Sequence, residues 1–157
     1  MKIIFNNTIF YTQKYGGVSR YISLLAKQLI KNKVDVSIIA PLYKNRYLKE
    51  IPNNNKKGIF IKRYPDYKIV NSISNFLTTY YINKSKSKII HDTYYSSSLL
   101  KINNKTKILT IYDLIHEKFP DLYEKNFISQ RKKIIDSSDF FICISETTRR
   151  DFINYYN

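Results

Sequence analysis

The chain has 157 residues, 43% of them hydrophobic and 25% charged, and its 27 Lys and Arg against 12 Asp and Glu give a formal net charge of +15. This length suits one domain with its own core. The single cysteine excludes an internal disulfide, no Cys/His cluster has zinc-site spacing, and no apolar run approaches the ~20 residues that cross a bilayer. Asn6, Asn7 and Thr8 interrupt the N-terminal apolar stretch before it reaches signal-peptide length. We therefore expect a cytoplasmic protein, soluble or peripheral at the inner face of a membrane.

The first forty residues predict a βαβ unit. Residues 2–5 are a β-branched and aromatic run, and residues 18–30 repeat apolar side chains with the period of one helix face. Residues 34–40 then predict a strand that Pro41 stops. The crossover between two such strands is right-handed, so the strands should be parallel.

The remaining chain continues the alternation of strands and helices. Residues 44–57 are polar and irregular, and residues 113–120 form a loop. The pattern predicts a single Rossmann-like three-layer α/β domain over residues 1–157, with a mainly parallel sheet of about six strands. Further strands are expected over 59–63, 88–91, 107–112 and 140–144, and helices over 69–82, 122–138 and from Ser145 onward.

The basic charge is scattered along the chain rather than gathered in one stripe. The composition leans to Lys, Asn, Ile, Tyr and Phe, as AT-rich coding would produce whatever the function. We interpret most of the charge as compositional. A functional basic face would suit anionic membrane lipids or phosphorylated ligands ahead of nucleic acid, and no nucleic-acid partner is expected.

Ligands of open parallel sheets bind at the carboxyl ends of the strands, so the loops that follow the strands deserve most weight. After the first strand, Gly16 and Gly17 open a helix whose N-terminus favours an anion, and Arg20 adds a forked cation. The alternative is a tight turn in which Gly17 caps the helix. The spacing is neither GxGxxG nor a P-loop.

Three later loops also carry polar groups. His91 leaves one strand with Tyr94 and Tyr95 behind it, as a cleft residue or as a hydrogen-bonded structural histidine. Asp113 and His116 lie in the densest ionisable cluster, which suits acid-base work or, alternatively, a solvated loop whose Asp113 caps a turn. Ser145 is a candidate N-cap, with Glu146 in the first turn and Cys143 as a small apolar residue before them.

In this order, the four loops resemble the N-terminal domain of family 4 glycosyltransferases, which are retaining enzymes with the GT-B fold. The matching segments span roughly residues 3–153. They read GGVSR from Gly16, IIHDTYY from Ile89, YDLIHEKFP from Tyr112 and CISETTRRDF from Cys143. Many relatives carry His directly before the Asp of the third segment, where this chain has Tyr112.

The resemblance implies two facing Rossmann-like halves, with this chain on the acceptor side and a second half holding a nucleotide sugar. It implies transfer of a hexose such as mannose to a polysaccharide or glycolipid acceptor, without a metal or other cofactor. Asp113 and His116 would take the catalytic positions, and Gly16, Gly17 and Arg20 would meet the donor diphosphate or sugar. The acceptor cleft would be lined by His91, Tyr94, Tyr95, Ser145 and Glu146.

The chain ends where the first half of such enzymes ends. We therefore expect the C-terminal donor-binding domain to be absent and the isolated chain to be inactive, unless a separate polypeptide completes it. Two alternatives stay open. One is a non-catalytic basic module that binds anionic membrane or nucleic acid, and the other is a non-functional gene remnant.

Overall fold

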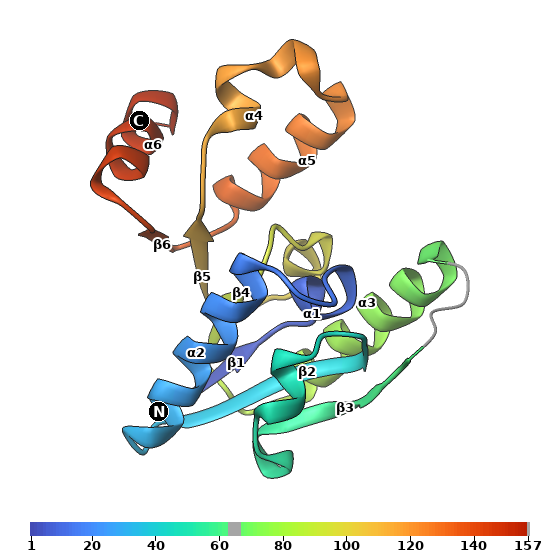
Figure 1. The fold of residues 1–157 in the computed structure, drawn as a ribbon. Helices are drawn as coiled ribbons and strands as arrows, with labels where there is room; N and C mark the ends of the chain where they lie inside the picture. The colour runs from blue at the N-terminus through green and yellow to red at the C-terminus, as the bar shows by residue number, and fades with distance from the viewer. Residues whose placement is uncertain (63–66, 157) are drawn as a thin grey trace.

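A six-stranded parallel sheet in the order β3-β2-β1-β4-β5-β6 organises the computed structural model, which describes residues 1–62 and 67–156 (Figure 1). Chain order reverses between β1 and β4, and this point is where ligands of open α/β sheets bind. The predicted Rossmann-like α/β class is confirmed. The strands are β1 (Lys2–Phe5), β2 (Asp35–Tyr43), β3 (Lys56–Phe60), β4 (Ile89–Asp92), β5 (Thr106–Ile111) and β6 (Phe140–Cys143).

Helices cover both faces of the sheet, so the core has two parts. The helices α1 (Thr8–Thr12) and α2 (Gly17–Lys31) pack on one face with Phe5 and Ile38. Alternate residues of the same strands point to the opposite face. There, Ile4 and Ile90 pack under side chains of α3 (Tyr67–Lys84) and α5 (Lys125–Asp136). The connections add α4 (Ile115–Lys118), α6 (Glu146–Tyr156) and the short 3-10 turns η1 (Tyr47–Glu50), η2 (Asn53–Asn55), η3 (Ser97–Lys101) and η4 (Pro120–Leu122).

The edge formed by β2 and β3 departs from prediction. Strand β2 continues through Pro41 to Tyr43 because the register shifts between Ile39 and Leu42, and such a bulge accommodates a residue without an N–H. Strand β3 begins at Lys56 rather than at residue 59, and residue 63 of the predicted strand lies outside the described residues. The predicted stop at Pro41 was wrong.

Two helical boundaries also differ. Sequence periodicity missed α1 and also α4, which lies within the predicted loop over 113–120, because five and four residues are too few to display a helical period. The predicted helix over 122–138 is shorter, since Pro120 starts the 3-10 turn η4 and α5 begins only at Lys125. The remaining predicted elements match within two residues at each end. No helix in the described part of the chain is long and apolar enough to cross a membrane.

Candidate active-site rim

A buried polar network joins the ends of β1 and β4 at the switch point. The Asn6 side-chain amide donates to the Asp92 carboxylate, and Asn6 Oδ1 accepts from the Thr93 N–H at 2.9 Å and from Thr93 Oγ1 at 2.7 Å. The Ser96 N–H donates to Asp92 Oδ2 at 3.0 Å. Burial raises the pKa of Asp92 to about 6 despite these donors. The network therefore fixes the start of the loop that follows β4.

His91 lies inside the sheet. Its side chain is buried, its Nε2 lies 2.8 Å from Thr110 Oγ1, and its ring stacks on Phe5 with centroids 5.0 Å apart. Burial lowers the pKa of His91 to about 4, so the ring is neutral near pH 7. These contacts favour the hydrogen-bonded structural histidine of the two alternatives. Its imidazole does not reach the surface, which removes the basis for placing it in an acceptor cleft.

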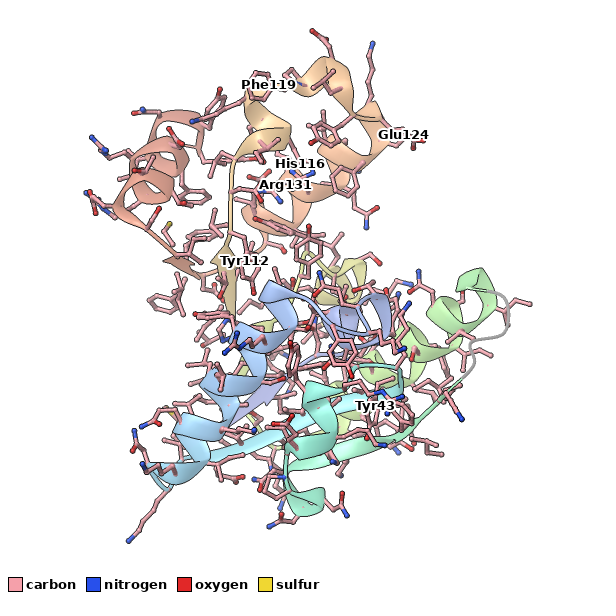
Figure 2. The ribbon with its side chains drawn as sticks, in the orientation of Figure 1. Tyr43, Tyr112, His116, Phe119, Glu124 and Arg131 are labelled. Carbon is pink, nitrogen blue, oxygen red and sulfur yellow. The ribbon has the colours of Figure 1, made fainter. Side chains whose placement is uncertain are left out.

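Three tyrosines gather at the carboxyl ends of β4 and β5. The Tyr112 hydroxyl donates to the Thr93 carbonyl at 3.2 Å, and the Tyr112 ring lies 6.0 Å from that of Tyr94 and 6.1 Å from that of Tyr21 in α2. Tyr94 meets the Tyr95 ring edge-on at 5.5 Å. Burial raises the pKa of Tyr94, so this half-buried phenol stays protonated near neutral pH. Figure 2 shows Tyr112 at the end of β5, below α4.

Arg131 of α5 ties the loop after β5 to this tyrosine cluster (Figure 2). Its Nη2 donates to the Asp113 carbonyl at 2.6 Å and its Nε donates to Glu117 Oε1 at 2.6 Å. The guanidinium lies over the Tyr95 ring, 3.7 Å from the centroid. Glu117 also accepts from the Tyr156 hydroxyl of α6 at 2.7 Å. Because Arg131 and Glu117 are both almost fully buried, this pair is a structural clamp rather than a free binding group.

The clamp leaves the Asp113 side chain partly exposed, whereas the neighbouring His116 side chain is largely buried. Asp113 Oδ1 accepts from the Ile115 N–H at 3.2 Å, so its carboxylate caps the first turn of α4 while staying partly exposed. His116 packs between Tyr123 and Phe127, with ring centroids at 4.3 Å and 5.0 Å. Its Nδ1 lies 3.7 Å from Asp113 Oδ1, too far for a hydrogen bond. Burial, followed by the nearby Arg131 charge, lowers the pKa of His116, which favours the neutral imidazole.

The glycine turn lies beside this group without contacting it. Gly16 has extended backbone, and its carbonyl accepts from the Arg20 N–H at 3.0 Å, while Gln13 Oε1 accepts from the Ser19 N–H at 3.4 Å. The Arg20 side chain lines a small cavity together with Tyr47 and Glu50, on the η1 side of α2. Among the residues that the structure describes, no contact joins this turn to Asp113 or His116. Tyr21, next to Arg20, makes the link to Tyr112 instead.

Ser145 and Glu146 form a helix start at the end of β6. Ser145 Oγ accepts from the Thr148 N–H at 3.1 Å, as expected of an N-cap. Glu146 accepts three hydrogen bonds from Arg149 on the exposed surface, and this pairing lowers the pKa of Glu146. Cys143 is half-buried, and burial raises the pKa of its thiol, which favours the unreactive form.

The structure therefore brings together the loops after β4 and β5 and ties Asn6, at the start of the loop after β1, to the loop after β4. It leaves the glycine turn and the helix start after β6 to either side. The partly exposed Asp113 carboxylate and the half-buried Tyr94 share one rim, with the largely buried His116 ring beside them, and an exposed carboxylate can orient and deprotonate a sugar hydroxyl. The described residues include no group of three or more His, Cys, Asp or Glu side chains able to hold a metal ion.

Sequence reasoning missed Arg131, Glu117 and the Asn6–Asp92 pair. The sequence does contain a clue to the role of Arg131, because this residue lies within the apolar stripe that Phe127, Ile134 and Ile135 form on α5. A charged residue at such a position is buried only with a partner. The adjacent pair of asparagines at the end of β1 offered no periodic signal.

Comparison with known proteins identifies the family. A protein-family model described as Glycosyltransferase Family 4 matches residues 15–157, which is nearly the whole chain. The chain therefore belongs to glycosyltransferase family 4. The comparison with curated proteins found no match.

Proposed function

We propose that the chain is the acceptor-side half of a retaining glycosyltransferase that transfers a hexose from a nucleotide sugar to a polysaccharide or glycolipid acceptor. The observation that carries the proposal is the rim at the ends of β4 and β5, where Arg131 holds the Asp113 backbone and leaves the Asp113 carboxylate partly exposed near Tyr94 and His116. Membership of the family supports a glycosyltransferase role.

In this proposal Asp113 and His116 receive the acceptor hydroxyl. The partly exposed Asp113 carboxylate accepts the hydrogen bond of the hydroxyl, and the neutral His116 ring lies beside it, with its Nδ1 buried and without a hydrogen-bond partner in the described chain. Tyr94 contributes an aromatic face on which a sugar ring can stack. The glycine turn and Arg20 meet the donor diphosphate, which a second Rossmann-like half brings across the rim.

The second half is part of the proposal because one Rossmann-like unit leaves the rim open to solvent. Water competes for an activated sugar in an open site, and enzymes of this kind need a closed cleft. We expect the 157 residues alone to transfer no sugar.

The test joins this chain to the donor-binding half of a family 4 glycosyltransferase and incubates the purified assembly with a panel of nucleotide sugars. We expect the assembly to release nucleoside diphosphate, and we expect neither half alone to do so. If a folded assembly releases no nucleotide with any donor while the intact enzyme that supplied the half remains active, the proposed function is wrong.

A basic, non-catalytic binding module is the second candidate. The cationic surface around α3, described below, favours it, and its binding would weaken steeply with salt. Binding without any transfer in the assembly would favour this candidate over the enzyme.

A further inference from the structure

Helix α3 has two opposed faces, and the outer one is the more apolar. The inner face consists of Val70, Ser74, Thr78 and Ile82, all at most 3% exposed. The outer face carries an apolar stripe at spacings of four, three and four residues: Ile69 is 61% exposed, Ile73 47%, Phe76 71% and Tyr80 44%. A helix in water normally shows the reverse arrangement, so a large exposed stripe of this kind marks an interaction surface.

Two lysines, Lys84 and Lys101, are placed at the stripe and its groove, and the surrounding sequence is rich in basic residues. Residues 51–112 contain eleven Lys and Arg but only two acidic residues, and one of these, Asp92, is fully buried. Helix α3 contains no acidic residue. Lys84 Nζ lies over the Tyr80 ring at 4.7 Å from the centroid, which places a cation at one end of the stripe. The surface therefore repels a second copy of itself and attracts an anionic partner.

A groove of about 650 Å³ runs between α3 and η3 and is walled by two residues of the stripe, Phe76 and Tyr80. It offers hydroxyl, amide and ammonium groups, which are hydrogen-bond donors suited to phosphate oxygens. Its remaining lining residues are Asn71, Ser72, Asn75, Thr79, Ser97, Ser98 and Lys101.

We propose that this face, the α3 stripe with its groove, docks the protein on an anionic lipid bilayer. The apolar stripe enters the boundary between headgroups and acyl chains, with α3 lying in the plane of the membrane. Lys84 and Lys101 reach lipid phosphates, and their long side chains let the charge stay in the headgroup layer. A bilayer fits better than a protein groove because it offers both an anionic surface and an apolar layer along the full length of the stripe. The inference does not depend on sugar transfer.

Because the sequence contains no tryptophan, a single introduced tryptophan reports on its own position through its fluorescence. Phe76→Trp places one fluorophore on the stripe, and Leu122→Trp places one at an equally exposed apolar position on η4. We expect the emission of F76W to shift to shorter wavelength with phosphatidylglycerol vesicles and to stay unchanged with phosphatidylcholine vesicles. The emission of L122W should respond to neither.

Binding strength is measured by co-sedimentation with the same vesicles. Phe76→Ser should weaken binding to phosphatidylglycerol vesicles about tenfold, because the variant has no phenyl ring to transfer from water into the bilayer. Leu122→Ser should leave the binding unchanged. Circular dichroism melting of each variant checks the fold, which substitution of an exposed side chain preserves.

Three results would overturn the proposal. The first is equal F76W shifts with the two kinds of vesicle, and the second is equal weakening by F76S and L122S. The third is a shift without vesicles that rises with protein concentration and accompanies a dimer mass in light scattering, which would assign this face to a second copy of the chain.

Discussion

Gly58 in β3 combines a backbone φ of +156° with a very close neighbour. A Cβ at this position would lie 1.6 Å from the Ala40 carbonyl oxygen, next to the bulge that admits Pro41 into β2. The position therefore excludes a side chain on two grounds, backbone conformation and space.

We expect Gly58→Ala to lower the free energy of unfolding by about 2 kcal/mol or more, since the backbone of β2 or β3 must move. Gly17→Ala is the matched control, because a Cβ there meets nothing within 4 Å and Ala is the better helix former. Urea unfolding compares the two variants. Equal stability of G58A and the wild type would show that the β2–β3 edge is arranged differently.

His91 and Asp92 are neighbours whose burial acts on stability in opposite directions with pH. The pKa of His91 falls from 6.5 to about 4 on folding, so between these pH values the unfolded chain binds a proton that the folded chain does not. The contribution of His91 to the free energy of unfolding is therefore lost as the pH drops from 6.5 toward 4. The pKa of Asp92 rises from 3.8 to about 6 on folding. The contribution of Asp92 to the free energy of unfolding is therefore full below pH 3.8 and is lost as the pH rises through 6. The two effects largely offset each other in the wild type.

His91→Gln should remove only the histidine effect. We expect the stability advantage of the wild type over H91Q to shrink by about 2 to 3 kcal/mol between about pH 7.5 and about pH 4.5. Urea unfolding at the two pH values gives this difference. A constant advantage at both pH values would mean that His91 is accessible to protons in the folded state.

At the scale of elements, the Arg131–Glu117 pair joins α5 to α4, and the Tyr156 hydroxyl adds α6 to the same carboxylate. Lys118 of α4 also pairs with Asp151 of α6 at 2.6 Å, and of these contacts the one made by Arg131 is the one that reaches the Asp113 backbone. Arg131 therefore determines how the rim is presented, although it reaches no solvent itself.

Arg131→Met should lower the free energy of unfolding by about 3 to 5 kcal/mol, because Glu117 is left buried without its partner. Adding Glu117→Gln should restore part of the loss, and Lys132→Met, at an exposed neighbouring position, should change little. Hydrogen exchange should show the largest loss of protection in α4 and α6. Uniform loss across the sheet would argue against a local clamp.

Sequence patterns predicted those elements whose periodicity is set by burial. The apolar face of α2 follows from its helical period, and β1 and β6 follow from their short continuous apolar runs, although most of β6 is exposed. The bulge at Pro41 and the turn before α5 depend on contacts with neighbouring segments, which no local pattern contains. The outer stripe of α3 contributed to the predicted helix, yet the sequence does not tell which of its two faces is buried.

Prediction of the site was limited in the same way. The loops after β4 and β5 could be found because parallel strands place their carboxyl ends at one edge. Whether a polar residue at that edge points outward depends on tertiary packing, which turned His91 inward and left Asp113 exposed. The partnership of Arg131 with Glu117 links residues fourteen positions apart on different helices, and it became visible only in three dimensions.

At the scale of the whole molecule, the chain has two working surfaces in this account. We propose that the rim at the ends of β4 and β5 carries the chemistry and that the α3 face binds the membrane. The first is the central proposal, and it depends on Asp113 acting through its carboxylate rather than as a turn cap alone.

Asp113→Asn separates these two roles, because an asparagine oxygen still caps α4 but cannot take a proton. In the two-half assembly we expect D113N to lower the rate of nucleoside diphosphate release about 100-fold. Asp121→Asn, an exposed carboxylate on the neighbouring η4, should leave the rate unchanged. A rate for D113N equal to that of the wild type would contradict the assignment of the reactive centre to this rim.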